Sequence, residues 1–548
     1  MKNCALLFVL MSSMSCLAQT TVWNGEDKTA GLWNRLSPKI VDNPDKSGIN
    51  KSDKCIRFTV TGRQSLFYRP PGAFVGDPMP FFDPVARDFK IMYLYEQRPN
   101  PEGTYHPFYG LSTTDAASYI ELGQMIQCGA IDDQDAALGT GSTIYDDSLQ
   151  LYYTFYTANR HNPTDNQDAQ VVMYATSKDF KTWQKSQLVL RGNPYFYYKS
   201  DFRDPFVFHG DDGTYHMLVS TKKDEKGVIA EFTSADLKSW TSAGVFMTMM
   251  WDRFYECPDV FKMGDWWYLV YSEMHSAIRR VQYFKGRTLE ELKACTANDA
   301  GQWPDSHEGF LDSRGFYAGK TASDGVNRYI WGWCPTRPNY DNTDVGAPPA
   351  KPEWAGNLVA HRIIQHEDGT LTLGEVPGIA DRFGSGATPE IIGKGGNVDG
   401  AGAQWLRLSG DSYVMFPKLA YRNRISFKVK TSDNADNFGL SFMRNVGSTK
   451  FYSVVVNSER EDKERKLNFE EQGSDGKGFI AGADSHYFER PADNTYNVTV
   501  VTDNSVCAVY INDRCCYTNR IYGTQRNCWT INSYGGTIEV SDVRVASF

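Results

Sequence analysis

Residues 266–271 read WWYLVY, and four similar stretches rich in aromatic and β-branched residues stand elsewhere in the chain. Such residues favour β-strands, and each stretch follows a polar turn that contains Asp. The other copies are KIMYLY at 90–95, LYYTFY at 151–156, YHMLVS at 215–220 and YIWGW at 329–333. Their starts recur every 51 to 64 residues, so the chain contains an internal repeat.

Each aromatic stretch is preceded, across its turn, by a shorter apolar stretch, so each repeat contains a β-hairpin. Residues 177–183 (SKDFKTW) match residues 234–240 (SADLKSW), which predicts a third strand that turns into a fourth. Five units of about four strands predict a five-bladed β-propeller, in which the first strand of each blade runs along a central channel. A row of separate sandwiches is the alternative, but the units are too short for it.

The propeller pattern covers residues 67–378 and is followed by a linker rich in Gly, Pro and Ser. Beyond it, residues 393–548 contain alternating strands without helical periodicity, which predicts a C-terminal β-sandwich in an all-β protein. We interpret the charged run Glu459–Lys466 as a solvated hairpin tip. Residues 19–66 are expected to form N-terminal strands, with the sandwich as a candidate packing partner.

The first 18 residues have the features of an export signal. Lys2 gives a positive start, residues 5–11 form an apolar run, and residues 16–18 (CLA) offer a small-residue cleavage site. Lipidation of Cys16 is the alternative, but residues 13–15 (SMS) lack the aliphatic residue usual before a lipidated cysteine. We therefore expect an exported protein in the periplasm, at the surface or outside of a bacterial cell. The nine cysteines that remain after cleavage are unevenly spaced and form no C-x-x-C motif, so we expect mostly free buried thiols, with a bridge or two permitted by export.

The composition excludes several classes of function. With 66 acidic and 57 basic residues, a net charge of −9 and no long Lys/Arg block, the chain is not suited to nucleic acid. Beyond the N-terminus, no stretch approaches the ~18 apolar residues of a membrane span. The 9 histidines are scattered without an H-E-x-x-H motif, which argues against a zinc hydrolase. The 14% aromatic content suits strands and sugar-stacking surfaces, which favours an oligo- or polysaccharide partner.

Three of the five first strands begin with a carboxylate close to a proline. The sequences are Gly76-Asp77-Pro78, Arg203-Asp204-Pro205 and Glu256-Cys257-Pro258. Because the first strands of a propeller surround one channel, these acids should gather at one mouth. A single Asp-Pro is common in turns, but three acids at one place of a repeat indicate a site, because clustered carboxylates are costly to keep ionised.

Two carboxyl groups that face a sugar ring are what cleavage of a glycosidic bond requires. One attacks the sugar or activates water, and the other donates a proton to the leaving oxygen. The longer side chain of Glu256 suits the proton donor, and Asp77 would attack the anomeric carbon. Asp204 would bind ring hydroxyls and stabilise the positive charge of the transition state. We predict no metal site and no cofactor, because this glycosidic cleavage requires none.

The order of these motifs resembles glycoside hydrolase family 32, the β-fructosidases that include invertases, inulinases and levanases. The further matches are Gly315-Phe316-Tyr317-Ala318 and Trp354-Ala355-Gly356 followed by Asp368-Gly369, so the resemblance covers about residues 68–377. It implies retention of configuration, with Asp77 as nucleophile, Glu256 as acid/base and Asp204 as transition-state stabiliser. It also implies that Arg203, Ser142 and Trp354 line the sugar pocket, with Tyr317 as a further substrate-binding candidate.

The nucleophile loop departs from the family's pattern. Members read Trp-Met-Asn-Asp-Pro-Asn-Gly there, whereas this chain reads FVGDPMP at 74–80, with Gly76 in place of the amide. The glutamine that closes the family's first aromatic strand is replaced by Leu94, although Gln97 lies close. A site built around such hydrogen bonds discriminates strongly on them, so hydrolysis of a furanoside is better supported than specificity for fructose.

The sequence therefore predicts a retaining hydrolase of β-fructofuranosidic bonds in fructan or sucrose-type substrates. An inverting furanosidase of the arabinan-degrading type, on the same propeller, is one alternative. A glycan-binding protein that kept the fold and lost the activity is another. In a third, the sandwich supplies the function by binding polysaccharide.

Overall fold

The computed structural model describes residues 38–42, 54–58, 65–98, 106–187, 190–192, 197–249, 254–274, 280–295, 309–336, 354–434, 436–443, 451–459, 464–472 and 478–548. The predicted export signal and Cys16 lie outside these residues. Strands β1 (Pro38–Asp42) and β2 (Lys54–Phe58) pair with each other, and packing of this region on the sandwich stays a prediction. No helix within the described ranges has the length and apolar character needed to cross a membrane.

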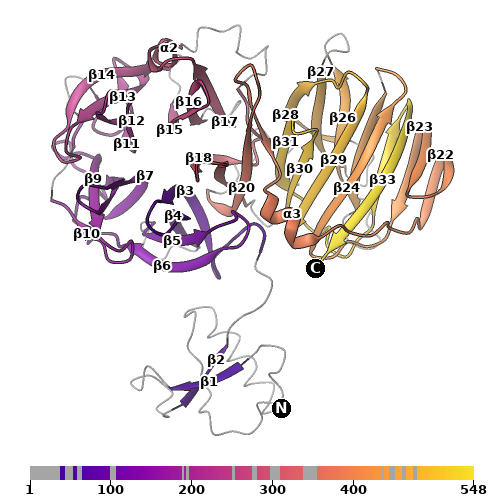
Figure 1. Ribbon diagram of the computed structural model, residues 1–548, viewed down its shortest axis with the longest axis horizontal. Coiled ribbons are helices and arrows are strands. Elements are labelled where there is room, and N and C mark those ends of the chain that lie inside the picture. Colours follow the sequence, from indigo (N-terminus) through magenta and orange to yellow (C-terminus); the bar gives the residue numbers. More distant parts are fainter. Residues whose placement is uncertain are drawn as a thin grey trace.

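The five hairpin repeats are the blades of a β-propeller, which confirms the predicted fold class (Figure 1). Blade 1 contains β3 (Ala73–Asp83), β4 (Asp88–Gln97), β5 (Phe108–Thr113) and β6 (Ile120–Ile126). Blade 2 contains β7 (Ala137–Asp146), β8 (Leu151–Asn159), β9 (Gln170–Ser177) and β10 (Gln184–Lys185). Blade 3 contains β11 (Phe202–His209), β12 (Tyr215–Lys223), β13 (Lys226–Ser234) and β14 (Thr241–Thr248).

Blade 4 contains β15 (Tyr255–Met263), β16 (Trp266–Glu273) and β17 (Arg280–Gly286), followed by helix α2 (Leu289–Ala294). Blade 5 contains β18 (Tyr317–Ser323), β19 (Arg328–Pro335), β20 (Gly356–Gln365) and β21 (Leu371–Gly374). The predicted aromatic stretches are the second strands, and the shorter apolar stretches before them are the first strands. Neighbouring first strands contact one another, and the ring closes between β18 and β3.

Every first strand is interrupted by a β-bulge near the same end. The unpaired residues are Gly76 and Asp77 in β3, Thr140 in β7, Asp204 and Pro205 in β11, Cys257 and Pro258 in β15, and Ala318 and Gly319 in β18. Asp204, Cys257 and Ala318 have φ angles of 60°, 54° and 54°. Because a bulge re-aims the side chains beside it, the five bulges form a ring from which polar groups reach one mouth of the channel.

The C-terminal strands form the predicted β-sandwich. They are β22 (Gly393–Gly402), β23 (Trp405–Phe416), β24 (Arg422–Thr431), β25 (Asn437–Met443), β26 (Phe451–Glu459), β27 (Glu464–Gln472), β28 (Gly478–Glu489), β29 (Thr495–Asp503), β30 (Val506–Ile511), β31 (Cys515–Arg520), β32 (Trp529–Tyr534) and β33 (Thr537–Ser547). Strand β23 pairs with β33 through one half and with β32 through the other, so the sheet turns a corner there. Apolar side chains such as Phe416 and Trp529 fill the space between the two layers.

Two local expectations need correction. The Gly-rich linker contains a short helix, α3 (Pro377–Phe383), which starts with proline, a residue that the first turn of a helix tolerates. The charged run 459–466 is not wholly solvated, because Arg465 is fully buried. Its guanidinium donates to the hydroxyl of Tyr496 at 2.7 Å and to the carbonyl of Asp436. None of the eight described cysteines beyond residue 100 forms a disulfide bond, in agreement with the predicted thiols.

The propeller and the sandwich lie side by side and share a buried seam (Figure 1). Strand β31 contacts β19 and β21 of blade 5. The guanidinium of Arg520 donates to the carbonyl groups of Cys334 and Pro335 at 2.7 and 2.9 Å. Arg424 and Glu375 form a two-bond ion pair across the same seam, at 2.8 Å for each bond. The sandwich therefore braces the blade that closes the propeller.

Candidate active site

The bulge ring brings the three predicted acids to one pocket. Asp77 of β3, Asp204 of β11 and Glu256 of β15 line a pocket of about 450 Å³ at the mouth of the channel, together with Arg203 and Trp354. The remaining wall is formed by Leu94, His106, Ala137, Leu138, Gly139, Thr140, Thr157, Asn159, Arg160, His161 and Gln170. A pocket of this size accommodates one or two sugar units.

Both carboxylate oxygens of Asp77 accept a hydrogen bond. The hydroxyl of Thr140 donates to Oδ2 at 2.5 Å, and the indole N–H of Trp333 donates to Oδ1 at 2.8 Å. Burial raises the pKa of Asp77, and these two hydrogen bonds oppose the rise because they stabilise the ionised form. The carboxylate is thus fixed in orientation by blades 2 and 5, as a nucleophile must be.

Asp204 is only 4% exposed, and it is held through its backbone as well as its side chain. Its N–H donates to the hydroxyl of Thr157 at 2.8 Å, and its Oδ2 accepts the N–H of Cys257 at 2.9 Å. Burial raises the pKa of Asp204 to about 7; Glu256 and Asp77 add to the rise and Arg203 opposes it. Three carboxyl groups this close favour a state in which they share a proton.

Glu256 is partly accessible, with 20% of its side chain exposed. Its Oε1 pairs with the guanidinium of Arg203 at 3.1 Å, and its Oε2 accepts the hydroxyl of Tyr317 at 2.8 Å. Arg203 also pairs with Asp201 at 2.8 Å and lies 3.9 Å from the centre of the Phe254 ring. Although burial opposes it, the charges of Glu256, Asp204 and Asp201 raise the pKa of Arg203, which stays a cation.

Tyr317 therefore contacts Glu256 and does not itself line the pocket. It packs with Cys257, Ala318 and Trp333 in a small cluster beneath the pocket. Cys257 itself is buried, and burial raises the pKa of its thiol well above the ordinary value, so it is a packing residue with a protonated sulfur.

Trp354 lines the pocket and explains the missing amide at position 76. A Cβ atom built on Gly76 would lie 2.2 Å from Cη2 of Trp354, so the indole occupies the space that a side chain at position 76 would take. The backbone carbonyl of Trp354 accepts a hydrogen bond from Arg98, and its ring packs 4.5 Å from the His106 ring. An aromatic edge thus stands beside the nucleophile where the family's pattern has an amide.

The second departure from the family's pattern is also visible in the pocket. Leu94 lines it with a buried apolar side chain. Gln97 lies at the exposed end of β4 and is not among the lining residues, so it does not replace the lost glutamine.

Ser142 is not part of this pocket, and the implied role in lining it is wrong. Its hydroxyl accepts the N–H of Val207 at 2.9 Å and so ties β7 to β11. It faces a second cavity of about 170 Å³, lined by residues that follow the bulges along the first strands. The reason is the bulge at Thr140, which turns that residue, two positions before Ser142, toward the acids.

Sequence reasoning missed three residues of the site. Thr140, Thr157 and Trp333 hold Asp77 and Asp204 by the hydrogen bonds given above. The three acids were recognised by the proline that follows them in the sequence. The bulge of blade 2 has neither a proline nor a carboxylate, so Thr140 was not recognised in this way. The available signal was the position of Thr140 in the repeat, directly before Gly141-Ser142.

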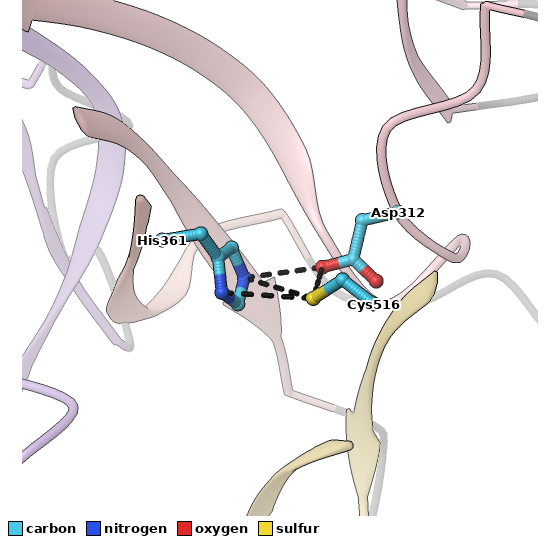
Figure 2. Close-up of side chains that lie close together, drawn as sticks. All are labelled: Asp312, His361 and Cys516. Carbon is cyan, nitrogen blue, oxygen red and sulfur yellow. Dashed lines mark hydrogen bonds and ion pairs between the residues drawn. The ribbon is translucent and has the colours of Figure 1, made fainter. Parts of the chain in front are cut away.

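One buried cluster has residue types that bind metals: Asp312, His361 of β20 and Cys516 of β31 (Figure 2). The sulfur lies 3.6 and 3.9 Å from the two ring nitrogens of His361, so it stands beside the ring and not in line with either lone pair. Nε2 is 3.1 Å from Asp312, and Nδ1 is bonded to the Tyr510 hydroxyl at 2.9 Å. The arrangement is a hydrogen-bonded contact of the seam, and it does not fit a cation held by all three residues.

Comparison with known proteins assigns both domains to one family. A family model described as the glycosyl hydrolases family 32 N-terminal domain matches residues 68–377, and one described as GH32, BT1760-like, C-terminal domain matches residues 369–545. The chain is 27% identical to a sucrose-6-phosphate hydrolase of Vibrio alginolyticus, over 50% of this chain and 57% of that protein. It is 26% identical to a raffinose invertase of Escherichia coli, over 44% and 49% of the two chains. The chain thus spans about half the length of these curated relatives.

Solved structures share the fold over nearly the whole length. A fructan 1-exohydrolase IIa of Cichorium intybus in complex with 1-kestose matches with a TM-score of 0.67 at 16% identity, over 89% of this chain and 97% of that chain. A sucrose-6-phosphate hydrolase of Lactobacillus gasseri matches with a TM-score of 0.66 at 16% identity, over 89% and 94%. Since the N-terminal family model alone covers more than half of the sequence, the protein belongs to glycoside hydrolase family 32.

Proposed function

We propose that this protein hydrolyses β-fructofuranosidic bonds with retention of configuration. The observation that carries the proposal is a pair of carboxyl groups in one pocket, each held through both oxygens by donors from other blades. Asp77 accepts from the neutral groups of Thr140 and Trp333, and Glu256 accepts from Tyr317 and from the guanidinium of Arg203. Retaining hydrolysis requires one carboxylate as nucleophile and one as acid/base, and the longer side chain of Glu256 suits the proton donor.

The chemistry then runs in two steps. In the first, an oxygen of Asp77 bonds to the anomeric carbon while the bond to the leaving oxygen breaks and Glu256 gives that oxygen its proton. In the second, Glu256 takes a proton from water, whose oxygen bonds to the anomeric carbon and releases the carboxylate of Asp77. Asp204 supplies a buried negative charge for the positive charge that develops on the ring in both transition states.

The names of similar proteins support a fructosyl substrate. They include a sucrose-6-phosphate hydrolase, a raffinose invertase and a fructan 1-exohydrolase. We place this chain's substrate among sucrose-type sugars and fructans, with the aromatic edge of Trp354 and the apolar Leu94 facing the sugar at two places where the family's pattern has amides. Loss of two hydrogen-bonding groups predicts weaker discrimination among furanosides.

The test is a screen of the purified protein on sucrose, inulin, levan and arabinan, with the anomer of the first product identified by NMR. We expect release of fructose, first in the β configuration. Asp77→Asn and Glu256→Gln should each lower kcat by a factor of about 10³ or more, since each removes a group that reacts. Release of the inverted anomer would replace the retaining mechanism with an inverting one.

The control is binding. If the wild type binds a fructan but releases no sugar, and both variants bind equally well, the protein is a glycan-binding member of the family. Removal of the residues after Gly384, followed by measurement of retention on insoluble glycan, tests whether the sandwich contributes to binding.

We also propose that the protein is exported and cleaved after Ala18, on the basis of the N-terminal sequence pattern. N-terminal sequencing of the mature protein from its native cell should give a first residue of Gln19. A mature chain that starts with a modified Cys16 would show a lipid anchor instead.

A further inference from the structure

Lys320 is a buried cation in the floor of the channel. It follows the bulge of β18 and is only 2% exposed. Its Nζ donates a 2.8 Å hydrogen bond to the carbonyl of Gly141 in β7, and it lies 5.0 Å from the centre of the Phe206 ring of β11. One side chain thus connects the first strands of three blades, next to the cavity beneath the acids.

The groups around Lys320 are mostly acidic. Burial lowers the pKa of Lys320, and four groups on three strands oppose this: Cys257 and Asp259 of β15, Asp204 of β11 and Asp77 of β3. A lysine that loses its hydration in this way is stabilised as a cation only by such neighbours. The attraction is mutual: burial raises the pKa of Asp259, and the ammonium group of Lys320 opposes this rise.

Two further cations, Arg203 and Arg328, lie near these acids. Arg203 is paired with Glu256 and Asp201 at the pocket mouth. Arg328 is a second cation of the floor and is half-buried, and the charge that acts on it is that of Asp259. Lys320 is therefore the cation of the floor whose neighbours include both Asp77 and Asp204.

The hydrogen bond of Lys320 also reaches the nucleophile through the backbone. Gly141, whose carbonyl it holds, directly follows Thr140, the bulge residue that donates to Asp77. A Cβ at Gly141 would lie 1.8 Å from the Phe155 carbonyl oxygen, so the backbone there is closely packed and has little freedom to shift. A change at Lys320 therefore alters both the charge near Asp77 and the anchor of its hydrogen-bond donor.

We infer that Lys320 is a positioning residue for the proposed nucleophile: it anchors the β7 bulge that carries Thr140 and supplies a buried positive charge near Asp77. This inference rests on the proposed function, since it concerns the ionisation of the proposed nucleophile. Lys320 does not line the sugar pocket, so it acts through the carboxylates and not on the substrate.

The experiment compares the pH dependence of kcat/KM for the wild type, Lys320→Met, Lys320→Gln and Lys320→Arg, with the best substrate of the screen. Without the cation, Asp77 takes up its proton at a higher pH, so the acidic limb should move up by about 1–3 pH units in the Met and Gln variants. Activity below that limb then falls about tenfold for each unit of the shift. Lys320→Arg, which keeps the charge, should restore the position of the limb.

Arg328→Met is the control, because it removes a half-buried cation that lines the same cavity and whose charge partner is Asp259. It should leave the acidic limb where it is in the wild type. Thermal unfolding of each variant shows whether it folds. If Lys320→Met does not fold, the comparison is made with Lys320→Gln alone.

An equal acidic limb in wild type and neutral variants overturns the inference. So does a loss of kcat/KM that is uniform across pH, which a purely structural lysine would give. If neither neutral variant folds, Lys320 is a requirement of the fold and the inference is again overturned. Failure of the proposed function is a separate result, because it appears as an inactive wild type in the screen.

Discussion

The hydroxyl of Thr140 donates a 2.5 Å hydrogen bond to Oδ2 of Asp77, so a residue of blade 2 orients the carboxylate of blade 1. The indole of Trp333 in blade 5 does the same for the other oxygen. The proposed nucleophile is therefore not fixed by its own strand, whose ladder is interrupted at this point. The closed ring of blades supplies the orientation.

Thr140→Val should lower kcat/KM without a large change of stability. A hydrogen bond to a charged group contributes about 1.5–3 kcal/mol, which corresponds to a loss of about 10- to 150-fold. Thr140→Ser, which keeps the hydroxyl, should retain most of the activity. The control is Thr143→Val in the same strand, where the lost partner is Thr154 and not an acid. Equal kinetics for Thr140→Val and Thr143→Val would contradict this role.

Gly76→Ala should disturb the sugar pocket because the new Cβ overlaps the indole of Trp354. We expect a decrease of kcat/KM of about tenfold or more, since small displacements in an active site are costly. In the double variant Gly76→Ala/Trp354→Phe, the shorter ring makes room, so the combined loss should be smaller than the product of the two single losses. Gly402→Ala in β22, where a Cβ meets nothing within 4 Å, is the control. Losses that simply multiply would exclude the proposed overlap.

Asp204→Asn should stabilise the protein at high pH while it abolishes activity. The pKa of Asp204 is raised to about 7, above the value of 3.8 expected when unfolded, so the native state binds this proton more tightly. The free energy of unfolding of the wild type therefore falls as the pH rises from about 4 to about 7, and the variant lacks this decrease. The gain should be on the order of 1–4 kcal/mol at pH 8 and close to zero at pH 4.

Thermal and urea unfolding at the two pH values measures this gain. Asp236→Asn is the control, because the pKa of this turn residue is shifted in the opposite direction. Backbone N–H groups of Ser239 and Lys238 lower it, so the ionised form of Asp236 stabilises the folded protein. It should not become more stable at pH 8. A gain for Asp204→Asn that is equal at pH 4 and pH 8 would show that burial of charge is not its cause.

Asp312→Ala should weaken the seam between propeller and sandwich. Asp312 accepts the N–H and hydroxyl of Thr518 at 2.7 and 2.6 Å and faces His361 (Figure 2). Although burial opposes it, the hydrogen bond and charge of His361 lower the pKa of Asp312, so its stabilising effect is present at neutral pH and lost in acid. Removal of one partner from such a buried group costs about 3–5 kcal/mol.

Urea unfolding at pH 7 checks this value. The matched control is Lys428→Ala, which breaks the half-exposed ion pair with Asp542 and should cost about 1 kcal/mol or less. An unfolding free energy of Asp312→Ala that equals that of the control would show that the seam does not depend on this cluster. Addition of zinc or a chelator to the wild type should leave the transition unchanged, as the geometry at His361 implies.

Local chemistry explains what could be predicted from the sequence. Aromatic strands and Asp-containing turns are short-range signals, so the five hairpins and the two domains were accessible from the repeat. The acids at 77, 204 and 256 could be predicted for the same reason, because Asp77 and Asp204 stand directly before the proline of their repeats and Glu256 stands one residue earlier.

Contacts between distant segments explain which features could not be predicted from the sequence. Trp333 and Asp77 are 256 residues apart, and neither local sequence predicts the hydrogen bond between them. The family resemblance implied that Ser142 lines the pocket. The bulge at Thr140 instead turns the side chain of Thr140 toward the acids. Arg465 stands in a charged run, yet Tyr496 of another strand gives it a buried acceptor.

The sequence by itself determined an all-β chain of five repeats with a carboxylate near the start of three first strands, because strand propensity and turn chemistry act over a few residues. Only the tertiary structure decided how those carboxylates are held: closure of the ring brings Thr140, Trp333 and Lys320 around them from other blades. It also decided that the ring of Trp354 fills the space at Gly76. Hydrogen bonds, close contacts and buried charge depend on which strands become neighbours, and that is settled only when the whole propeller closes.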